Sequence, residues 1–288
     1  FNLDNLTIIV DRNNFQQTGS SNSILNLENL KNKFESFGCF VLDVDGQKVG
    51  YLMYNKFLNE FDDQLIQTFT DFATEGITDL VVDLRYNGGG SVRTCVYLAS
   101  MITGQFTDEI FAQQIWNSKL LAYFEALNSN TNDSDDRELN NYFTSTNSEG
   151  VTLPALNLNT VYIIATNRSA SASELLINGL APHINVVLIG NTTYGKNVGS
   201  ITVYDYIDNE GTKNPNHTYA MQPIVLKIAN SAGFADYANG LEPDIELRER
   251  ASNLGVLGSP TEPLLFEALN QISGSGKYLV PEGEALVP

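Results

Sequence analysis

Histidine is scarce in this chain, with two residues, His183 and His217, among 288. A catalytic triad of serine, histidine and aspartate would need one of them close to the nucleophile. His183 follows a proline where a predicted helix ends, and His217 lies in a loop rich in proline and asparagine, so neither has a flanking motif. We interpret both as surface residues, and a nucleophile in this chain would need a base other than histidine.

Positive charge is also scarce. The chain carries 16 Lys and Arg against 34 Asp and Glu, a formal net charge of -18 at pH 7. A surface of this sign repels phosphate backbones and anionic membrane surfaces, so the composition argues against nucleic acid as a partner. Hydrophobic residues make up 42% of the chain, which is enough for the sizeable core of a folded globular protein.

Cysteine and long apolar runs are scarce as well. Cys39 and Cys95 lie far apart in apolar surroundings, which predicts buried free thiols and argues against a disulfide scaffold or a metal cluster. No apolar run approaches the length of a membrane span, and residues 1–5 lack the basic and apolar segments of a signal peptide, so we expect a soluble chain. It opens without methionine, so we expect a piece of a longer protein, and the missing signal says little about export.

The N-terminal part is predicted to stand apart from the rest. Residues 6–10 predict a strand, and residues 18–26 are rich in Gly, Ser and Asn, which is typical of a flexible connection. We place a boundary there, with an N-terminal strand and linker over residues 1–30 and one large domain over residues 31–288.

Strand and helix patterns alternate through the large domain. Residues 39–42 and 48–53 predict a hairpin, and an amphipathic helix follows that ends at Gly76. Further on, the apolar strand 80–84 leads into a glycine loop and a helix. The strand 161–165 leads likewise into a serine-rich turn, a helix and another strand. Such alternation predicts an α/β architecture with buried sheet strands.

Two further segments are interpreted as peripheral. Residues 105–153 contain a polar stretch over 128–136 that cannot pack a core, so we expect a polar insertion. It would be either a lid over the site or a surface excursion without a role in the chemistry. Near the end, Ser259 and Glu262 have the spacing of a helix capping box, which predicts a structural C-terminal helix over residues 259–273.

A nucleophile and a base are offered by the serine-rich run over residues 169–174 and by a lysine further on. A serine needs a partner that takes its proton, and a lysine can do so when desolvation or a positive neighbour lowers its pKa. Most lysines lie on the surface in water, but the apolar residues before and after Lys196 predict partial desolvation. Ser171 and Lys196 are therefore the candidate catalytic pair.

Donors for an oxyanion are expected where the two strands end. Backbone N–H groups at the start of a helix are unpaired and carry the positive end of the helix dipole. Glycine lets such groups approach a substrate closely, so Gly88, Gly89 and Ala172 are the candidate donors, although an isolated glycine run is better explained as an ordinary tight turn. Glu174, in the first turn of the same helix as Ala172, is sufficiently explained by the helix dipole.

Three motifs occur in order along the chain: residues 83–90 (DLRYNGGG), residues 169–174 (SASASE) and residues 193–196 (TYGK). Together with residues 239–245 (NGLEPDI), they resemble the motifs of the C-terminal processing, or tail-specific, serine proteases. Three ordered motifs make this resemblance specific, and it covers roughly residues 37–247.

The resemblance implies a serine/lysine dyad on an α/β fold related to the crotonase and Clp protease core, with strand and helix units and a mixed sheet. It implies cleavage of proteins near their C-termini, without a cofactor or a metal, on protein or peptide substrates whose C-termini are accessible. The family's nucleophile is the middle serine of the run, about 25 positions before the lysine, which selects Ser171 over Ser169 and Ser173. Residues 1–30 would hold the end of a PDZ-like domain, and bacterial members usually act outside the cytoplasm, in the periplasm or cell envelope.

Two alternatives stay open. Residues 190–197 match the G-x-x-x-x-G-K core of a phosphate-binding loop, but Asn197 replaces the Mg²⁺-binding Ser or Thr, and a strand is predicted to follow instead of a helix. Many members of the protease family carry Gln four positions after the lysine, where this chain has Ser200, whose hydroxyl would orient the amine over a shorter reach. The leading alternative is therefore a peptide-binding module without turnover, and the sequence predicts no oligomeric state.

Overall fold

The computed structural model describes two stretches of the chain's N-terminal part and most of the rest. The described residues are 15–16, 19–20, 39–44, 46–130, 139–208, 210–250 and 252–274. Contacts divide the chain into two units, 1–37 and 38–288. In the first unit, β1 (Phe15–Gln16) pairs antiparallel with β2 (Gly19–Ser20). The strand predicted over 6–10 lies outside the described residues.

The second unit is built on a six-stranded mixed sheet with the strand order β14-β9-β8-β5-β4-β3. The hairpin of β3 and β4 is antiparallel, and the neighbours from β4 to β14 pair parallel. The strands are β3 (Cys39–Val44), β4 (Gln47–Met53), β5 (Asp79–Asp83), β8 (Thr160–Ala165), β9 (Asn185–Gly190) and β14 (Ile245–Glu246). The predicted α/β architecture with a mixed sheet is confirmed.

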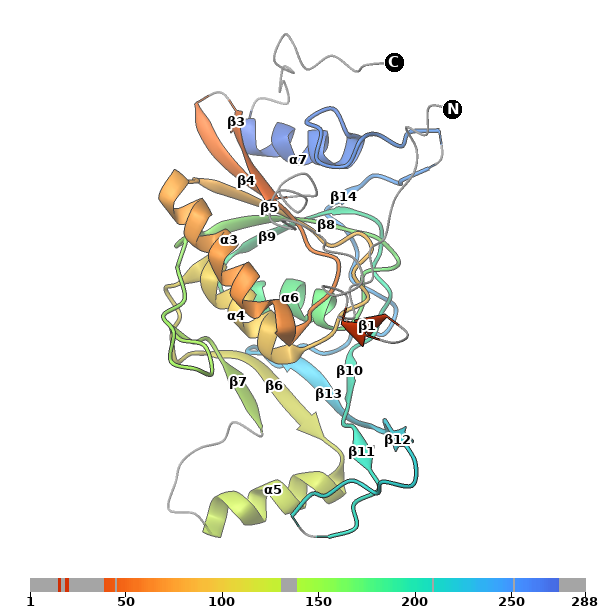
Figure 1. Ribbon diagram of the computed structural model, residues 1–288. Coiled ribbons are helices and arrows are strands. Elements are labelled where there is room, and N and C mark those ends of the chain that lie inside the picture. The colour runs from red at the N-terminus through yellow and green to blue at the C-terminus, as the bar shows by residue number, and fades with distance from the viewer. Residues whose placement is uncertain are drawn as a thin grey trace. The chain divides into compact units, whose positions relative to one another are not determined.

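Both faces of this sheet are buried, because successive side chains of a strand point to opposite sides. Val82 and Ile163 join a core on the side of helices α3, α4 and α6, whereas Val81 and Ile164 join a second core under α7 (Figure 1). The helices are α3 (Asp62–Glu75), α4 (Val92–Thr103), α6 (Ala172–Leu180) and α7 (Pro263–Ser273), with a short 3-10 turn η1 (Asn59–Phe61) before α3.

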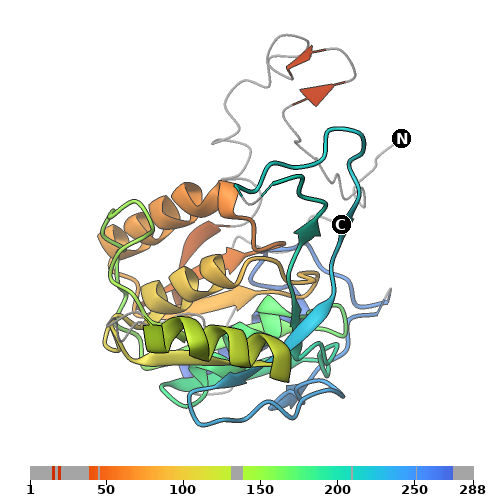
Figure 2. The same ribbon diagram turned by 90° about the horizontal axis from the view of Figure 1, so that it is seen from below.

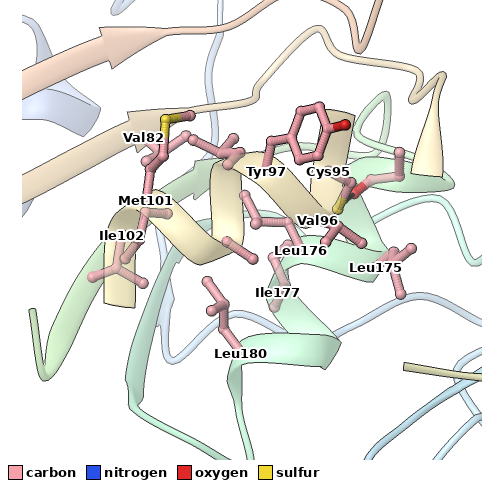
Figure 3. Packing of buried hydrophobic residues seen from close by; sticks show 14 of the residues in the cluster. Val82, Cys95, Val96, Tyr97, Met101, Ile102, Leu175, Leu176, Ile177 and Leu180 are labelled. Atoms are coloured by element: carbon pink, nitrogen blue, oxygen red, sulfur yellow. Dashed lines mark hydrogen bonds between the residues drawn. The ribbon is translucent and has the colours of Figure 1, made fainter. Parts of the chain in front are cut away.

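The two helices that follow the predicted loops pack against each other under the sheet. Figure 3 shows Val96 and Met101 of α4 in one cluster with Leu176 and Leu180 of α6. Leu176 and Met101 are fully buried. The apolar faces that the sequence predicts for these helices therefore meet, and their N-termini are held at the same edge of the sheet.

A second, four-stranded sheet lies on the other side of α6, with the strand order β10-β13-β6-β7 (Figures 1 and 2). Its strands are β10 (Val198–Ser200), β13 (Ile224–Asn230), β6 (Ile110–Trp116) and β7 (Asn140–Tyr142). Beyond β10, the short strands β11 (Val203–Tyr204) and β12 (Ala220–Met221) pair antiparallel, and α5 (Ser118–Asn130) contacts β6.

Residues 105–153 differ from the predicted polar insertion. Strand β6 is an interior strand of the second sheet, and Phe111 and Phe143 are almost fully buried. The Phe111 ring lies against Gly179 of α6, where an added Cβ would come within 2.4 Å of it. The polar residues 128–136 hide these buried side chains in the sequence pattern, because burial depends on contacts with distant segments. A lid role for the segment stays a prediction.

The predicted capping box at the C-terminal helix is wrong. Helix α7 begins at Pro263, and its N-cap is Glu262, whose carboxylate accepts a hydrogen bond from Leu265 N. The helix therefore covers 263–273 and not 259–273. The Glu262 carboxylate also accepts hydrogen bonds from Arg85.

Arg85 is the centre of a buried ionic cluster that joins α7 to the end of β5. Its guanidinium lies 2.7 Å from Asp83 and 2.9 Å from both carboxylate oxygens of Glu262, and 3.2 Å from Glu249. Tyr51 donates a further hydrogen bond of 2.8 Å to Asp83. Burial opposes ionisation of Glu262, but the hydrogen bonds and charge of Arg85 outweigh it and lower the pKa of Glu262 below 4.5.

Neither histidine contacts the candidate serine among the described residues. His183 is half-buried between the rings of Phe106 and Phe143, and its Nε2 lies 3.1 Å from the Ile110 carbonyl, so its interpretation as a surface residue is wrong. His217 bonds Asp205 in the exposed hairpin beyond β11. Within the described residues, no helix is long and apolar enough to cross a membrane.

We expect Glu262→Gln to lower the free energy of unfolding by about 2 kcal/mol at neutral pH, because it leaves a buried guanidinium with one charged partner fewer. The folded-state pKa of Glu262 lies below its ordinary value, so its contribution is present above about 4.5 and is lost as the pH falls through the folded-state pKa. The difference between wild type and Glu262→Gln should therefore shrink as the pH falls below 4.5, measured by urea unfolding.

The matched control is Glu246→Gln, because Glu246 pairs with Arg248 at the surface with both side chains more than half exposed. Such a pair contributes little, so this variant should unfold close to wild type. Equal losses in the two variants would contradict the role given to the buried cluster.

Candidate active site

Two loops meet because their parent strands are parallel neighbours. Strands β5 and β8 pair directly, and their carboxyl ends lead to residues 87–90 and to the serine-rich turn. The backbone of Asn87 holds the turn: its carbonyl accepts hydrogen bonds from Ala170 N (3.1 Å) and Ser173 Oγ (2.8 Å). The glycine loop and the serine turn therefore form one structure, as their positions after parallel strands predict.

The three serines of the turn differ in their surroundings. Ser169 and Ser173 are fully buried, and each hydroxyl donates to a backbone carbonyl, Ser169 to Leu84 at 2.6 Å and Ser173 to Asn87. Ser171 is only half-buried, at the N-cap of α6. The two outer serines are thus fixed as structural residues, which leaves Ser171 as the serine of the run placed to meet a substrate.

Ser171 has an unusual backbone conformation, with φ 59° and ψ -113°. A residue with a Cβ pays for a positive φ in strain, and such strain is maintained where the surrounding structure fixes it and is frequent at functional sites. Here the turn sits between a buried strand and a buried helix. The geometry therefore presents the Ser171 side chain at the N-terminus of α6, where the positive end of the helix dipole favours negative charge.

Gly89 lies directly against Ser171. A Cβ at Gly89 would stand 2.7 Å from Ser171 Cβ and 2.8 Å from Ala172 N, and its φ is +97°, so the position requires glycine. Its own amide donates to Asn87 Oδ1 at 2.8 Å. Gly88 is exposed and has open space around it, so it is the candidate donor that a substrate oxygen can approach without displacing a bond.

Glu174 joins the serine turn to the lysine loop. Its carboxylate is fully buried, and Oε2 accepts from Ser171 N (2.9 Å) and Lys196 N (2.8 Å), while Oε1 accepts from Thr193 Oγ1 (2.5 Å) and Gly195 N (2.5 Å). The helix dipole alone, which the sequence suggested as a sufficient explanation, does not account for this. One carboxylate fixes the backbone of both candidate catalytic residues.

The side chain of Lys196 does not match the predicted desolvation. It is exposed, and among the described residues no hydrogen bond joins its Nζ to Ser171 Oγ or to Ser200. Its flanking strand is short and lies at the edge of the second sheet, so the apolar neighbours in sequence do not cover it. Ser200 is exposed at the end of β10, and its role as an orienting residue stays a prediction.

The loop around Lys196 also differs from a phosphate-binding loop. The residues after Lys196 form strand β10, where a phosphate-binding loop continues into a helix. Gly195 is needed for another reason: a Cβ there would stand 2.3 Å from the Ala238 carbonyl oxygen. Gly195 thus packs against residues 238–240, Gly190 packs against the Ala165 backbone, and the geometry argues against nucleotide binding.

Sequence reasoning missed Asn87 and Tyr237. The Asn87 side chain is fully buried, donates to the Tyr54 carbonyl and accepts from Gly89, so it shapes the glycine loop. Its place before three glycines was the available signal. Tyr237 is 3% exposed, and burial, followed by the charge of Glu174, raises its pKa. No sequence pattern predicts the burial of Tyr237, because its neighbours come from distant segments.

The residues of the site are those of nucleophilic chemistry. Within the described ranges, no group of three His, Cys, Asp or Glu side chains is arranged to hold a metal ion. Cys95 is buried, donates to the Ala172 carbonyl at 3.3 Å, and burial raises the pKa of its thiol well above its ordinary value. It is a structural residue beneath the helix start.

Comparison with known proteins finds C-terminal processing peptidases among the similar sequences. The C-terminal processing peptidase of the Tetradesmus obliquus chloroplast is 25% identical over 227 residues, covering 76% of this chain and 41% of the relative. The carboxyl-terminal-processing protease of Picosynechococcus is 21% identical over 229 residues, covering 80% of this chain and 46% of that protein. The chain spans less than half the length of these curated relatives.

A solved S41 protein from Bacteroides fragilis shares the fold, with a TM-score of 0.66 and 31% identity over 82% of this chain and 57% of that one. The fold that the resemblance implied is thus confirmed. Residues 48–247 match the model of peptidase family S41 and include the glycine loop, the serine turn and Lys196. This protein therefore belongs to peptidase family S41.

Proposed function

We propose that this protein is a serine endopeptidase that cleaves proteins near their C-termini through a Ser171 and Lys196 dyad. The observation that carries the proposal is the carboxylate of Glu174, which binds the backbone of both residues. The names of the curated relatives support C-terminal processing, and protein substrates follow from the family. Action outside the cytoplasm stays a prediction from the resemblance.

The proposed reaction is an acyl transfer in two steps. Ser171 Oγ attacks the scissile carbonyl carbon while neutral Lys196 takes its proton, and the N–H groups of Gly88 and Ala172 donate to the oxyanion. The C–N bond then breaks, and Lys196 returns the proton to the departing amine. A water molecule attacks the ester in the same way, which releases the new C-terminus and frees Ser171.

The exposed position of Lys196 adds a requirement to this mechanism. General base catalysis needs the amine within hydrogen-bond reach of Ser171, and such contacts often form only when the substrate is bound. The flexible stem of lysine permits that movement, because Glu174 fixes only its backbone. A substrate lying over Lys196 would exclude water from the amine at the same time.

A peptide-binding protein without turnover is the second candidate. The exposed Lys196, with no bond to Ser171 in the described structure, is the observation that favours it. Both candidates bind peptides, so a binding assay does not distinguish them. They differ in the reactivity of Ser171.

A fluorophosphonate probe separates the two candidates. We expect the protein to be labelled, Ser171→Ala to abolish labelling, and Lys196→Ala to lower the labelling rate by about 100-fold, since general base catalysis contributes at least that much. Mass spectrometry of the labelled protein locates the modified residue.

Lys227→Ala is the matched control, because it removes an exposed lysine of β13 and should label at the wild-type rate. Labelling that persists in Ser171→Ala, or that is insensitive to Lys196→Ala, would exclude the dyad. No labelling together with retained peptide binding would establish the second candidate.

The role of Glu174 gives a second test. Glutamine has one acceptor oxygen where the carboxylate has two, so the amide NH₂ of Glu174→Gln would face two N–H or O–H donors. We expect the labelling rate to fall by at least about tenfold, because an unpaired buried donor costs about 1–3 kcal/mol and displaces the loop. Labelling is measured on protein shown to be folded by circular dichroism.

Glu242→Gln is the matched control here. Glu242 is exposed and accepts a hydrogen bond from Thr192 Oγ1, in the same loop, at 2.8 Å. We expect this variant to label close to wild type. Equal rates for Glu174→Gln and wild type would show that the buried carboxylate does not position the dyad.

A further inference from the structure

Strand β10 lies at an open edge of the second sheet, and it begins two residues after Lys196. The sheet order is β10-β13-β6-β7, so β13 covers one side of β10, and no other described strand pairs with it. An edge strand presents unpaired N–H and C=O groups that a further extended chain can bind. The base of the proposed dyad therefore leads directly into a strand with a free edge.

The pairing shows which residue of β10 faces that edge. Ile228 N donates to the Asn197 carbonyl, and the register then pairs Val198 with Lys227. Antiparallel pairs alternate between bonded and non-bonded, so the N–H and C=O of Val198 point away from β13. The pairing of β13 with β6 is consistent with this. Asn117 N donates to the Val225 carbonyl, so by the same alternation the N–H and C=O of Lys227 point towards β6 and away from β10.

The distance from this edge to the candidate base is short. Two residues of extended chain span at most about 7 Å, and a paired strand lies about 4.8 Å away. A peptide residue bound to Val198 would thus lie beside Lys196, close enough to cover its exposed side chain. This is the cover that the proposed mechanism requires.

The side chains next to the edge favour an apolar residue in the peptide. Ser200 pairs with Ile224, so the two side chains share one face of the sheet, and Ile224 is 66% exposed. The small Ser200 leaves Ile224 open towards a chain bound beyond it.

We propose that β10 binds the substrate as an added strand: an extended peptide segment bonds the N–H and C=O of Val198 and places an apolar side chain over Ser200 against Ile224. This inference rests on the proposed function for its occupant, a peptide substrate. It names the mode of binding and the preferred side chain at a position next to the dyad.

The test measures binding alone, in the Ser171→Ala background, so that turnover plays no part. The probe is a dye-labelled peptide in which leucine and serine alternate, followed by fluorescence anisotropy at physiological salt. Val198→Pro removes the outward N–H without removing a bond to β13, whereas Val198→Ala keeps it. We expect Val198→Pro to bind about fivefold more weakly than Val198→Ala, the loss of one net hydrogen bond.

A second measurement needs no change in the strand. Peptides methylated at one backbone nitrogen at a time are bound to the Ser171→Ala protein, and at least one position should weaken binding by about fivefold, because its N–H no longer reaches the Val198 carbonyl. Ile224→Thr should weaken binding of the leucine peptide more than that of a matched alanine peptide.

The outcomes are distinct. Equal affinities for the two Val198 variants, or no effect of any methylated position, would overturn the strand-addition site. If Val198→Pro fails to fold, judged by thermal unfolding, the methylated peptides decide alone. Wild-type protein that takes no fluorophosphonate label, while these binding differences hold, would refute the protease proposal and leave the binding site standing.

Discussion

The arrangement of the site depends on one buried carboxylate. Glu174 accepts four hydrogen bonds, two from the backbone of Ser171 and Lys196 and two from Thr193 and Gly195. A buried charge is tolerated only where hydrogen bonds replace water, and here the replacing donors come from two segments far apart in the chain. The hydrogen bonds that stabilise the buried Glu174 carboxylate therefore also hold the serine turn and the lysine loop next to each other.

The scaffold around Glu174 is held from both faces of the main sheet. On one side, α4 and α6 pack through Met101 and Leu176, which fixes the start of α6. On the other, Arg85 binds Glu262 at the start of α7, so the C-terminal helix is tied to the strand that ends in the glycine loop. Ser171 and Lys196 are thus bonded through their backbone, whereas the Lys196 side chain is exposed.

The fit between prediction and structure varies with the range of the interactions involved. The glycine C-cap of α3 and the hairpin of β3 and β4 follow from local patterns, and both are confirmed. The predictions of a polar insertion around Phe111 and of a desolvated Lys196 are wrong: Phe111 is buried and Lys196 is exposed. Burial depends on the distant segments that pack on a side chain. The predicted capping box is wrong because Glu262 is itself the N-cap of α7, where its carboxylate also bonds the distant Arg85.

The sequence by itself determined the family, the alternation of strand and helix, and the order of the glycine loop, the serine turn and the lysine, since these are carried by neighbouring residues and periodic patterns. Only the tertiary structure decided that Ser169 and Ser173 are bonded into the core, that Glu174 joins the two loops, and that Val198 faces an open edge. Side-chain burial, strand order and hydrogen-bond direction depend on contacts between distant segments, so local sequence patterns do not predict them.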